Sequence, residues 1–427
     1  MYGWAVWFLV VLVLVQHVDA RNVLSIPRNP KSRKVGIVSL NFQLKQKALD
    51  ANVTGQTTVI ADSVSHTLIT TIGVGTPAQV MAVQIDTGSS LFWLRSSKCR
   101  GTSCSGQPVY DNTKSTSYLP PAPATALTGP QRRSIVYGDN TKVECQLGAD
   151  TVMLGTLVIP NQTLCEADVI QTTTGSSDGL IGLGPPGADT ATDVFRNMIA
   201  SKTISKPVAS FWYNQSRQFS DTNAGQITFG GMDSSKFTGS FTWFPIPITG
   251  RNHWSTTFEG ITLDSAPLTQ NRTGMAIFDT GTTLAIIPSD TLSAIVLAAN
   301  AKQLPNQSLY EIPCDKVSRI PPVTFHIGQR RITLFAEQQV FVVDGTCFLI
   351  YAASTSNLNV DVILGALFLR HFYTVFDFGA SRTGLAISAG QVANSLRLTG
   401  KSAGSRVNVD VRWAVVLGWM VLSSLLM

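Results

Sequence analysis

The chain has 427 residues, too many for one ordinary domain and enough for two lobes of about 150 to 180 residues once the ends are set aside. Its formal net charge of +6 comes from residues 21–50, which hold seven basic side chains and one acidic one. Residues 51–400 are nearly neutral, with 22 basic and 23 acidic side chains. The basic overall charge therefore does not indicate a nucleic-acid partner, and we expect none.

Residues 1–20 are mostly apolar and end in Val18-Asp19-Ala20, which has the small-x-small pattern of a cleavage site. This pattern predicts a secretory signal peptide. The segment has no basic residue before its apolar run, so a membrane anchor is the alternative.

After residue 60, short runs rich in Val, Ile, Thr and Phe alternate with Gly, Pro, Asn and Asp, which predicts a mainly β body. Residues 80–85, 226–229 and 331–335 are predicted strands, and residues 193–201 and 289–301 are predicted helices. The second helix opens with Pro288-Ser289-Asp290, where we expect an N-terminal cap. We place a lobe boundary within residues 244–251, where Pro245 and Pro247 interrupt the strand pattern.

Two similar motifs each end an apolar run. They are Asp86-Thr87-Gly88-Ser89 and Asp279-Thr280-Gly281-Thr282, and their aspartates lie 193 residues apart. One copy could be only a turn signal, but two copies in matching contexts indicate a duplicated half-site.

The chemistry of paired carboxyl groups explains these motifs. Two carboxyl groups about 3 Å apart cannot both ionise cheaply, so they share one proton. The charged group can act as a base towards water, and the neutral group can donate a hydrogen bond to a carbonyl. Gly88 and Gly281 allow tight turns beside the carboxyl groups, and the hydroxyls of Ser89 and Thr282 are expected to orient them.

From about His66 to Ser388, the chain resembles the pepsin-type aspartic proteases. Six segments carry the resemblance in order: residues 72–77, 86–94, 134–139, 178–184, 276–288 and 362–377. The resemblance implies a mainly β, bilobal pepsin-like fold, with an N-terminal lobe over residues 61–247, a C-terminal lobe over residues 248–390 and the active site between them. It also implies an aspartic endopeptidase with Asp86 and Asp279 as the catalytic pair.

The resemblance further implies a flap hairpin that closes over the substrate. Tyr137 would be the flap tyrosine, followed by Gly138 and Asp139, and Trp93 would support it by a hydrogen bond. Tyr137 as a cross-strand aromatic and Trp93 as a core residue remain the alternatives.

The sequence departs from the family pattern at two places. Asn140 stands in the flap where a second glycine is common, and we expect Asn to tolerate the positive φ of such a turn. Ala366 stands where an aspartate is common, which changes the electrostatics near the pair without removing a catalytic group.

The basic residues that precede the body fit a zymogen prosegment over residues 21–60, whose exact end the sequence does not define. Its cations would face an acidic cleft. By resemblance, Lys45 or Lys47 would pair with the two aspartates, and a solvated basic tail is the alternative.

Six cysteines fit a secreted chain. The resemblance implies the pairs Cys99–Cys104 and Cys314–Cys347, which leaves Cys145–Cys165 to join the region after the flap. The five histidines are scattered and no Cys-x-x-Cys occurs, so we expect no metal and no cofactor.

Residues 391–427 are predicted to be a C-terminal linker and a signal for glycosylphosphatidylinositol attachment. Small residues at Ser402, Ala403 and Gly404 precede a polar spacer and the mostly apolar residues 413–427. Ser402 is the first choice of attachment site. A transmembrane tail is the alternative, although fifteen residues are short for a spanning helix.

Asn-x-Ser/Thr sites make glycosylation plausible in the secretory pathway. The five candidates are Asn52, Asn161, Asn214, Asn271 and Asn306.

Together these features predict a zymogen that becomes a membrane-anchored, cell-surface or secreted monomer cleaving extended peptides. An inactive pepsin-fold binding or inhibitor protein and a cell-surface scaffold are the alternatives. Both are opposed by the presence of Asp86, Asp279 and Tyr137.

Overall fold

The computed structural model describes most of the body and leaves both ends aside. It covers residues 55–61, 68–121, 123, 131–171, 177–185, 192–214, 224–248, 252–268, 273–305, 307–354, 360–391 and 396–399. The predicted signal peptide, most of the basic segment and the predicted attachment site lie outside these residues. Within them, no helix is both long enough and apolar enough to cross a membrane.

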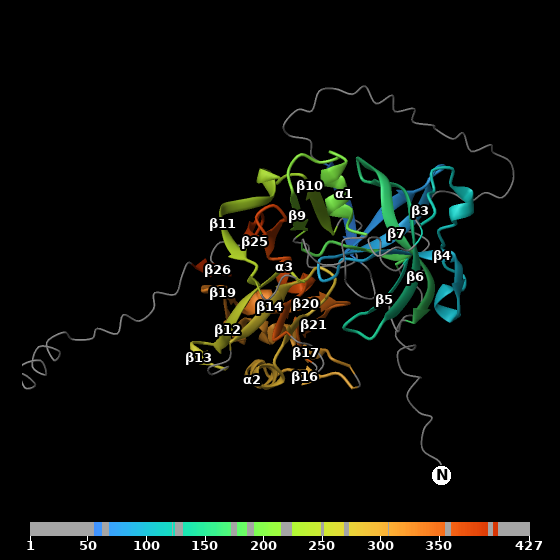
Figure 1. The fold of residues 1–427 in the computed structure, drawn as a ribbon. Helices are drawn as coiled ribbons and strands as arrows, with labels where there is room; N and C mark the ends of the chain where they lie inside the picture. The colour runs from blue at the N-terminus through green and yellow to red at the C-terminus, as the bar shows by residue number, and fades with distance from the viewer. Residues whose placement is uncertain are drawn as a thin grey trace, which may run out of the picture. The chain divides into compact units, whose positions relative to one another are not determined.

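The body is built mainly from β-strands, with three short α-helices among the described residues (Figure 1). The largest sheet has the strand order β11 (Phe237–Pro245), β25 (Arg382–Ser388), β24 (Phe372–Asp377), β9 (Val208–Tyr213), β10 (Gly225–Phe229), β1 (Gly55–Ala61), β2 (Leu68–Val74), β3 (Gln79–Asp86), β8 (Gly179–Gly182), β4 (Phe92–Arg100), β7 (Leu157–Gln171), β6 (Lys142–Leu154) and β5 (Arg132–Val136).

The second half of the chain forms most of two further sheets. The larger has the order β22 (Tyr351–Ala353), β15 (Ala285–Ile287), β23 (Val362–Leu364), β14 (Gly274–Phe278), β12 (Ser255–Leu263), β18 (Val323–Ile327), β19 (Arg330–Leu334) and β26 (Leu396–Thr399), and β13 (Ala266–Pro267) pairs with β12. The smaller comprises β16 (Lys302–Gln303), β17 (Tyr310–Ile312), β21 (Thr346–Leu349) and β20 (Val340–Val343). The helices are α1 (Val194–Ala200), α2 (Ser289–Ala299) and α3 (Ala366–Leu369).

The three predicted strands and two predicted helices are present as β3, β10, β19, α1 and α2. The cap of α2 differs from the prediction: Pro288 occupies the N-cap position and makes no side-chain hydrogen bond. Asn300 ends this helix in the left-handed conformation, with φ of 51°. The helix therefore ends at Ala299, before the predicted end at residue 301, because Asn tolerates the left-handed geometry that ends a helix.

Strand pairing does not follow chain order at the two ends of the body. β24 and β25, within residues assigned from sequence to the second lobe, pair with β9 and β11 in the largest sheet. β1 also joins this sheet, next to β10 and β2, although its first six residues fall within the interval assigned to the prosegment. Hydrophobic periodicity predicts strands and gives no partner for them, so such long-range pairings are not visible in the sequence.

The two halves repeat one local arrangement. β3 pairs in parallel with β8 and β14 pairs in parallel with β23. In each half a short antiparallel partner follows, β4 on β8 and β15 on β23. Asp178 and Asp361 accept equivalent backbone hydrogen bonds, from Ala82 at 2.8 Å and Met275 at 3.0 Å. This repeat positions the two Asp-Thr-Gly loops in the same way.

Buried apolar side chains form one large core and a smaller, separate cluster beside the β5–β6 hairpin. We call the smaller one the satellite cluster. Its buried members are Leu91, Trp93, Val143, Cys145, Leu147, Cys165, Ala167, Ile170 and Leu180, with Cys99, Ile135 and Tyr137 packed against them.

Three disulfides are present, and they join the cysteines that the sequence analysis paired: Cys99–Cys104, Cys145–Cys165 and Cys314–Cys347. The second of these lies inside the satellite cluster.

Candidate active site

Asp86 is the last residue of β3, and Asp279 directly follows β14. β3 alternates buried and more exposed residues, and β14 ends in three buried apolar residues. Each aspartate therefore lies at the end of a strand, next to the parallel partner of that strand. Asp86 is 5% exposed and Asp279 is 7% exposed. Two carboxyl groups are thus removed from water at the meeting of the two repeats.

Each carboxyl group is held by its own loop in the same way. The Gly88 N–H donates to Asp86 Oδ1 at 2.7 Å, and the Ser89 hydroxyl donates to Asp86 Oδ2. In the second loop, Gly281 N–H donates to Asp279 Oδ1 at 2.8 Å. The Thr282 hydroxyl donates to Asp279 Oδ2 at 2.6 Å. The expected orienting contacts of Ser89 and Thr282 are therefore present, and the two glycines add backbone hydrogen bonds that were not predicted.

The two loops face each other at close range. A methyl group added to Gly88 would lie 2.6 Å from the carboxylate carbon of Asp279, and one added to Gly281 would clash with the Asp86 carboxylate. Each glycine is therefore required because the aspartate of the opposite loop occupies the space of a side chain. The two carboxyl groups are therefore close neighbours, and the charge of Asp279 acts on Asp86.

The electrostatics of this pair favour one shared proton. Burial raises the pKa of Asp86 well above its ordinary value, and the neighbouring charge of Asp279 raises it further. Hydrogen bonds from Ser89 and Gly88 oppose this pKa shift without cancelling it. Such a pair can hold a neutral acid beside an ionised base at one site.

Two threonines, to which the sequence analysis gave no role, lock the loops together. The backbone N–H of Thr87 donates to Thr280 Oγ1 at 3.1 Å, and the Thr280 N–H donates to Thr87 Oγ1 at 3.0 Å. Each hydroxyl then donates to a strand of the other half, Thr87 to the carbonyl of Phe278 and Thr280 to that of Ile85. The signal was available, since Thr stands between Asp and Gly in both motifs.

Further contacts cross between the halves around the pair. The Gln84 side chain donates to the Gly281 carbonyl at 3.1 Å, and His253 Nδ1 lies 3.1 Å from the Gly88 carbonyl oxygen. The buried indole of Trp254 donates to the Leu183 carbonyl at 2.7 Å. No sequence signal identified these three residues, because each contact depends on the tertiary arrangement.

The β5–β6 hairpin carries Tyr137 to the same region. Trp93 Nε1–H donates to the Tyr137 hydroxyl at 2.9 Å, which is the predicted contact. Burial raises the pKa of Tyr137, and so does the charge of Asp86, so the phenol is neutral and lies within electrostatic range of the pair.

Gly138 and Asp139 form the exposed tip of this hairpin. Asp139 accepts hydrogen bonds from the backbone and the hydroxyl of Thr141, both at 2.9 Å, which closes the turn. Asn140 has φ of 66°, so the expected tolerance of Asn for this geometry is confirmed. Ala366, the other departure, is buried at the start of α3, and its N–H donates to the Thr282 carbonyl at 2.7 Å.

Comparison with known proteins agrees with this geometry. The family model described as "Eukaryotic aspartyl protease" matches residues 67–388. The chain is 31% identical to pepsin A of Gallus gallus over 327 residues, which cover 74% of this chain and 83% of that protein. The chain belongs to the eukaryotic aspartyl protease family. It is therefore an aspartic-type endopeptidase, and the predicted bilobal pepsin-like fold is confirmed.

A second curated relative and a solved structure are also similar to this protease. Rhizopuspepsin-4 of Rhizopus niveus is 35% identical over 316 residues, covering 72% of this chain and 73% of that protein. The crystal structure of aspartic proteinase from Irpex lacteus aligns with a TM-score of 0.66 and 28% identity, covering 80% of this chain and 99% of that chain.

The remaining candidate sites of the protease are placed only in part. Asn161 is exposed, with φ of 50°, and Asn214 is partly buried after β9. Asn52, Asn271 and Asn306 lie outside the described residues, as do the candidate attachment residues Ser402, Ala403 and Gly404.

Proposed function

We propose that Asp86 and Asp279 are the catalytic pair of this protease. The observation that carries the proposal is the pair itself: two buried carboxyl groups on loops that face each other at close range, each held by equivalent contacts. The ionised carboxyl takes a proton from a water molecule, and the protonated carboxyl donates to the carbonyl oxygen of the scissile peptide. The water oxygen then adds to the carbonyl carbon, so no covalent bond to the enzyme forms.

The substrate in this proposal is an extended peptide that binds between the two lobes, under the β5–β6 hairpin. Tyr137, Gly138 and Asp139 would cover it, with Trp93 supporting the tyrosine. Trp93 and Tyr137 belong to the satellite cluster, so the surface beside the pair is apolar. We therefore expect hydrophobic side chains next to the cleaved bond.

The protease is made, in this proposal, as a zymogen whose prosegment begins at residue 21 and ends within residues 21–60. Support comes from charge: seven basic side chains in residues 21–50 precede a nearly neutral body with a carboxyl pair at its centre. Lys45 or Lys47 would neutralise that pair, and acid would release the segment by protonating its carboxylate partners. Pairing of β1 with β10 and β2 places Gly55–Ala61 in the folded body, so we expect processing before residue 55.

We place the mature protein at the cell surface, held by a glycolipid at Ser402, Ala403 or Gly404. β26 ends at Thr399 and pairs with β19, and this strand lies beyond the part of the chain matched by the family. Only two residues separate Thr399 from Ser402, so the tether would be short. β19 and β26 lie on the opposite side of Figure 1 from β5 and β6, which would leave the hairpin free to admit substrate.

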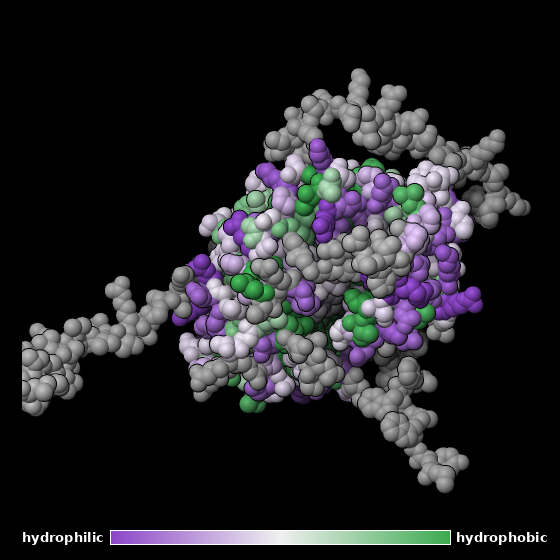
Figure 2. Space-filling model, viewed as in Figure 1, coloured by the Kyte–Doolittle hydropathy of each residue, from purple (hydrophilic) through white to green (hydrophobic). Residues whose placement is uncertain are grey.

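We propose a monomer without nucleic-acid or cofactor partners, and the face seen in Figure 2 agrees with a monomer. On the face seen in Figure 2, hydrophobic residues occur in small separate groups among hydrophilic ones. Stable dimers usually bury a larger apolar patch than such groups provide.

The test is cleavage of a peptide library by the acid-treated protein, with a statine-type transition-state analogue as a titrant. We expect cleavage in acid, complete inhibition at one analogue per chain, and little activity while residues 21–50 remain attached. Binding of peptides without cleavage would instead favour the inactive binding protein.

A further inference from the structure

The disulfide Cys145–Cys165 occupies an unusual place in this protein. Both cysteines are fully buried in the satellite cluster, outside the large core. Cys145 lies on β6, the second strand of the hairpin that carries Tyr137. Cys165 lies on β7, directly opposite Trp93 in the parallel β4–β7 ladder. The bond therefore joins the hairpin to the strand that neighbours the tryptophan.

A second link joins the hairpin to β4. The indole N–H of Trp93 donates to the Tyr137 hydroxyl at 2.9 Å, so β4 and the hairpin tip are connected on the side of the catalytic pair. A third link lies nearer the solvent, where Arg132 of β5 makes two hydrogen bonds of 2.9 Å to Asp168 of β7. This exposed ion pair is worth little by itself. Of these three links, the disulfide and the indole hydrogen bond therefore contribute most to holding the hairpin.

The ladder itself is interrupted at this point. Glu144 pairs with Val169 and Cys145 pairs with Ala167, so Asp168 is an extra residue in β7. A bulge locally disrupts the ladder and bends the strands. The β6–β7 pairing is thus interrupted within the part of β6 that also pairs with β5, and the disulfide lies at that position.

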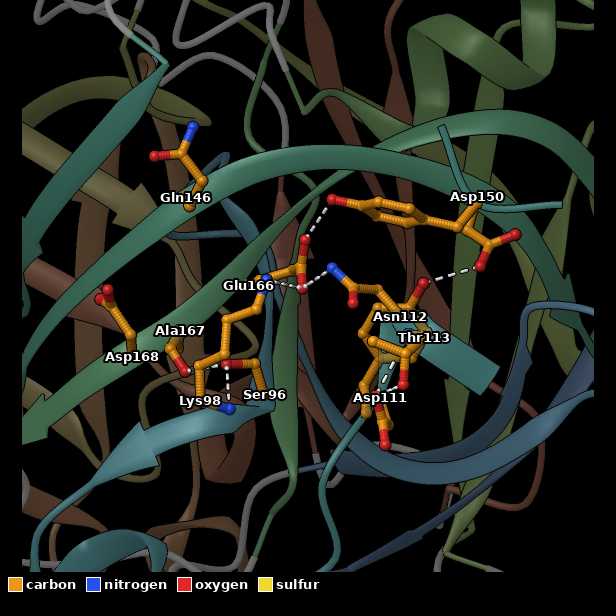
Figure 3. A network of polar contacts seen from close by, with 12 residues as sticks. Ser96, Lys98, Asp111, Asn112, Thr113, Gln146, Asp150, Glu166, Ala167 and Asp168 are labelled. Carbon is orange, nitrogen blue, oxygen red and sulfur yellow. Dashed lines mark hydrogen bonds and ion pairs between the residues drawn. The ribbon is translucent and has the colours of Figure 1, made fainter. Parts of the chain in front are cut away.

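Side-chain contacts on the opposite face of β7 fix this strand, so β7 is the rigid element to which the disulfide holds the hairpin. Glu166, which is buried between Cys165 and Ala167, accepts hydrogen bonds from Asn112 at 2.8 Å and Tyr118 at 2.5 Å (Figure 3). Lys98 adds an ion pair to it at 3.5 Å. Ser96 of β4 donates to the Ala167 carbonyl at 2.9 Å. Any freedom gained on loss of the disulfide would therefore appear in the hairpin.

We propose that Cys145 and Cys165 are positioning residues for the reaction: their disulfide holds the β5–β6 hairpin so that Tyr137 stays against Trp93 and above Asp86. The proposal rests on the proposed function of the pair. A cross-link removes conformations that the hairpin could otherwise visit, and small displacements of a group near the reacting atoms cost rate.

The test compares two disulfides in the full chain, expressed with its own signal and prosegment. One variant is Cys145→Ala/Cys165→Ala, and the matched control is Cys314→Ala/Cys347→Ala, which removes the bridge between η6 (Cys314–Arg319) and β21. Active sites are titrated with the statine-type analogue, so that kcat is measured per competent molecule. Amide hydrogen exchange is followed in residues 132–142 at a temperature where both variants are folded.

We expect kcat and kcat/KM of the Cys145/Cys165 variant to fall together by about tenfold, as for an interaction made in the transition state, with little change in KM. Exchange in residues 132–142 should rise by a similar factor. The control should keep kcat within about threefold and leave that exchange unchanged. Equal changes in both variants, or an unchanged kcat per titrated site, would overturn the proposal.

A third variant covers the case in which the first does not fold. Trp93→Phe removes the indole donor and keeps the disulfide, so exchange in residues 132–142 should stay close to that of the unaltered protein. If this change alone frees the hairpin, the disulfide does not hold it. Hydrogen exchange also separates this proposal from the proposed catalytic function. It reports how firmly the hairpin is held even if no form of the protein cleaves peptides.

Discussion

At the scale of single residues, burial of ionisable groups has opposite consequences at two places. Asp86 is a buried acid whose pKa is raised, and His371 is a buried base whose pKa is lowered. Burial disfavours the charged form of each group. Ionisation of Asp86 therefore destabilises the folded state as pH rises, and protonation of His371 destabilises it as pH falls. Stability should therefore be limited from both sides of the pH scale.

His371 lies at the end of α3, with Nε2 at 3.1 Å from the Gln338 carbonyl oxygen and Nδ1 at 3.3 Å from Gln391 Nε2. Burial, together with the nearby charge of Arg370, lowers its pKa to about 3. Because the unfolded chain takes up a proton near pH 6.5 and the folded one near 3, stability is lost between these values as pH falls.

His371→Gln should reduce this loss. Between pH 7 and pH 4, chemical unfolding of the unaltered protein should show a decrease on the order of 3 kcal/mol that is absent from the variant. If both proteins lose the same free energy of unfolding over this interval, His371 is not the group that titrates.

Asp86→Asn should change stability with the opposite dependence on pH. The raised pKa of Asp86 means that its contribution is favourable below pH 4 and is lost as pH rises through the folded pKa. Asn has no charge to bury, so the variant should melt at a higher temperature than the unaltered protein at pH 7. The two melting temperatures should converge at pH 3, and a constant difference across this range would argue against the shift.

At the scale of elements, the structure rests on a duplicated strand-and-loop unit. Thr87 and Thr280 bind across the junction of its two copies, each donating to and accepting from the other half. Both side chains are fully buried, so each hydroxyl has no water to replace a lost partner.

Thr280→Val should destabilise the protein by about 3 kcal/mol, because the Thr87 N–H and the Ile85 carbonyl lose their partner in a buried place. The control is Thr280→Ser, which keeps the hydroxyl and should retain most of the stability. Denaturant unfolding of both variants gives the comparison. A loss in Thr280→Ser as large as that in Thr280→Val would contradict a dominant role of the hydroxyl.

Much of the element pattern and of the site could be predicted from the sequence, for identifiable reasons. The motifs around Asp86 and Asp279 combine apolar strands with tight turns, and both signals are local. The joining of β24 and β25 to β9, and the contact of His253 with the Gly88 loop, depend on long-range packing. The start of α2 was local enough to predict, but the absence of a side-chain hydrogen bond at its N-cap, Pro288, was not visible in the sequence.

At the scale of the whole molecule, the folded body and its chain ends have different tasks. In the proposed function, the body carries the site, and the ends would decide when and where the site is available. Residues 413–427 would form a helix of only about 22 Å, against a hydrocarbon core of roughly 30 Å. A cleaved tail with a glycolipid in its place fits this length better than a spanning segment does.

Phosphatidylinositol-specific phospholipase C should therefore release the protease from intact cells. Truncation after Gly400 should send it into the medium, because the attachment site is removed. The control is a known lipid-anchored protein on the same cells. Retention of the protease while the control is released, or detection of Met427 in the mature chain by mass spectrometry, would contradict the lipid anchor.

The central claim is that hydrolysis requires both carboxyl groups, and the most direct measurement is peptide cleavage by purified Asp86→Asn and Asp279→Asn proteins in acid. Asp315→Asn, a change at an exposed carboxylate of the second half, is the control. Because one carboxyl group cannot supply both acid and base, each of the first two changes should lower kcat by at least about 10²- to 10⁴-fold while secretion and folding persist. The control should cleave at the unaltered rate. Substantial cleavage by either Asp86→Asn or Asp279→Asn would contradict the shared-proton mechanism.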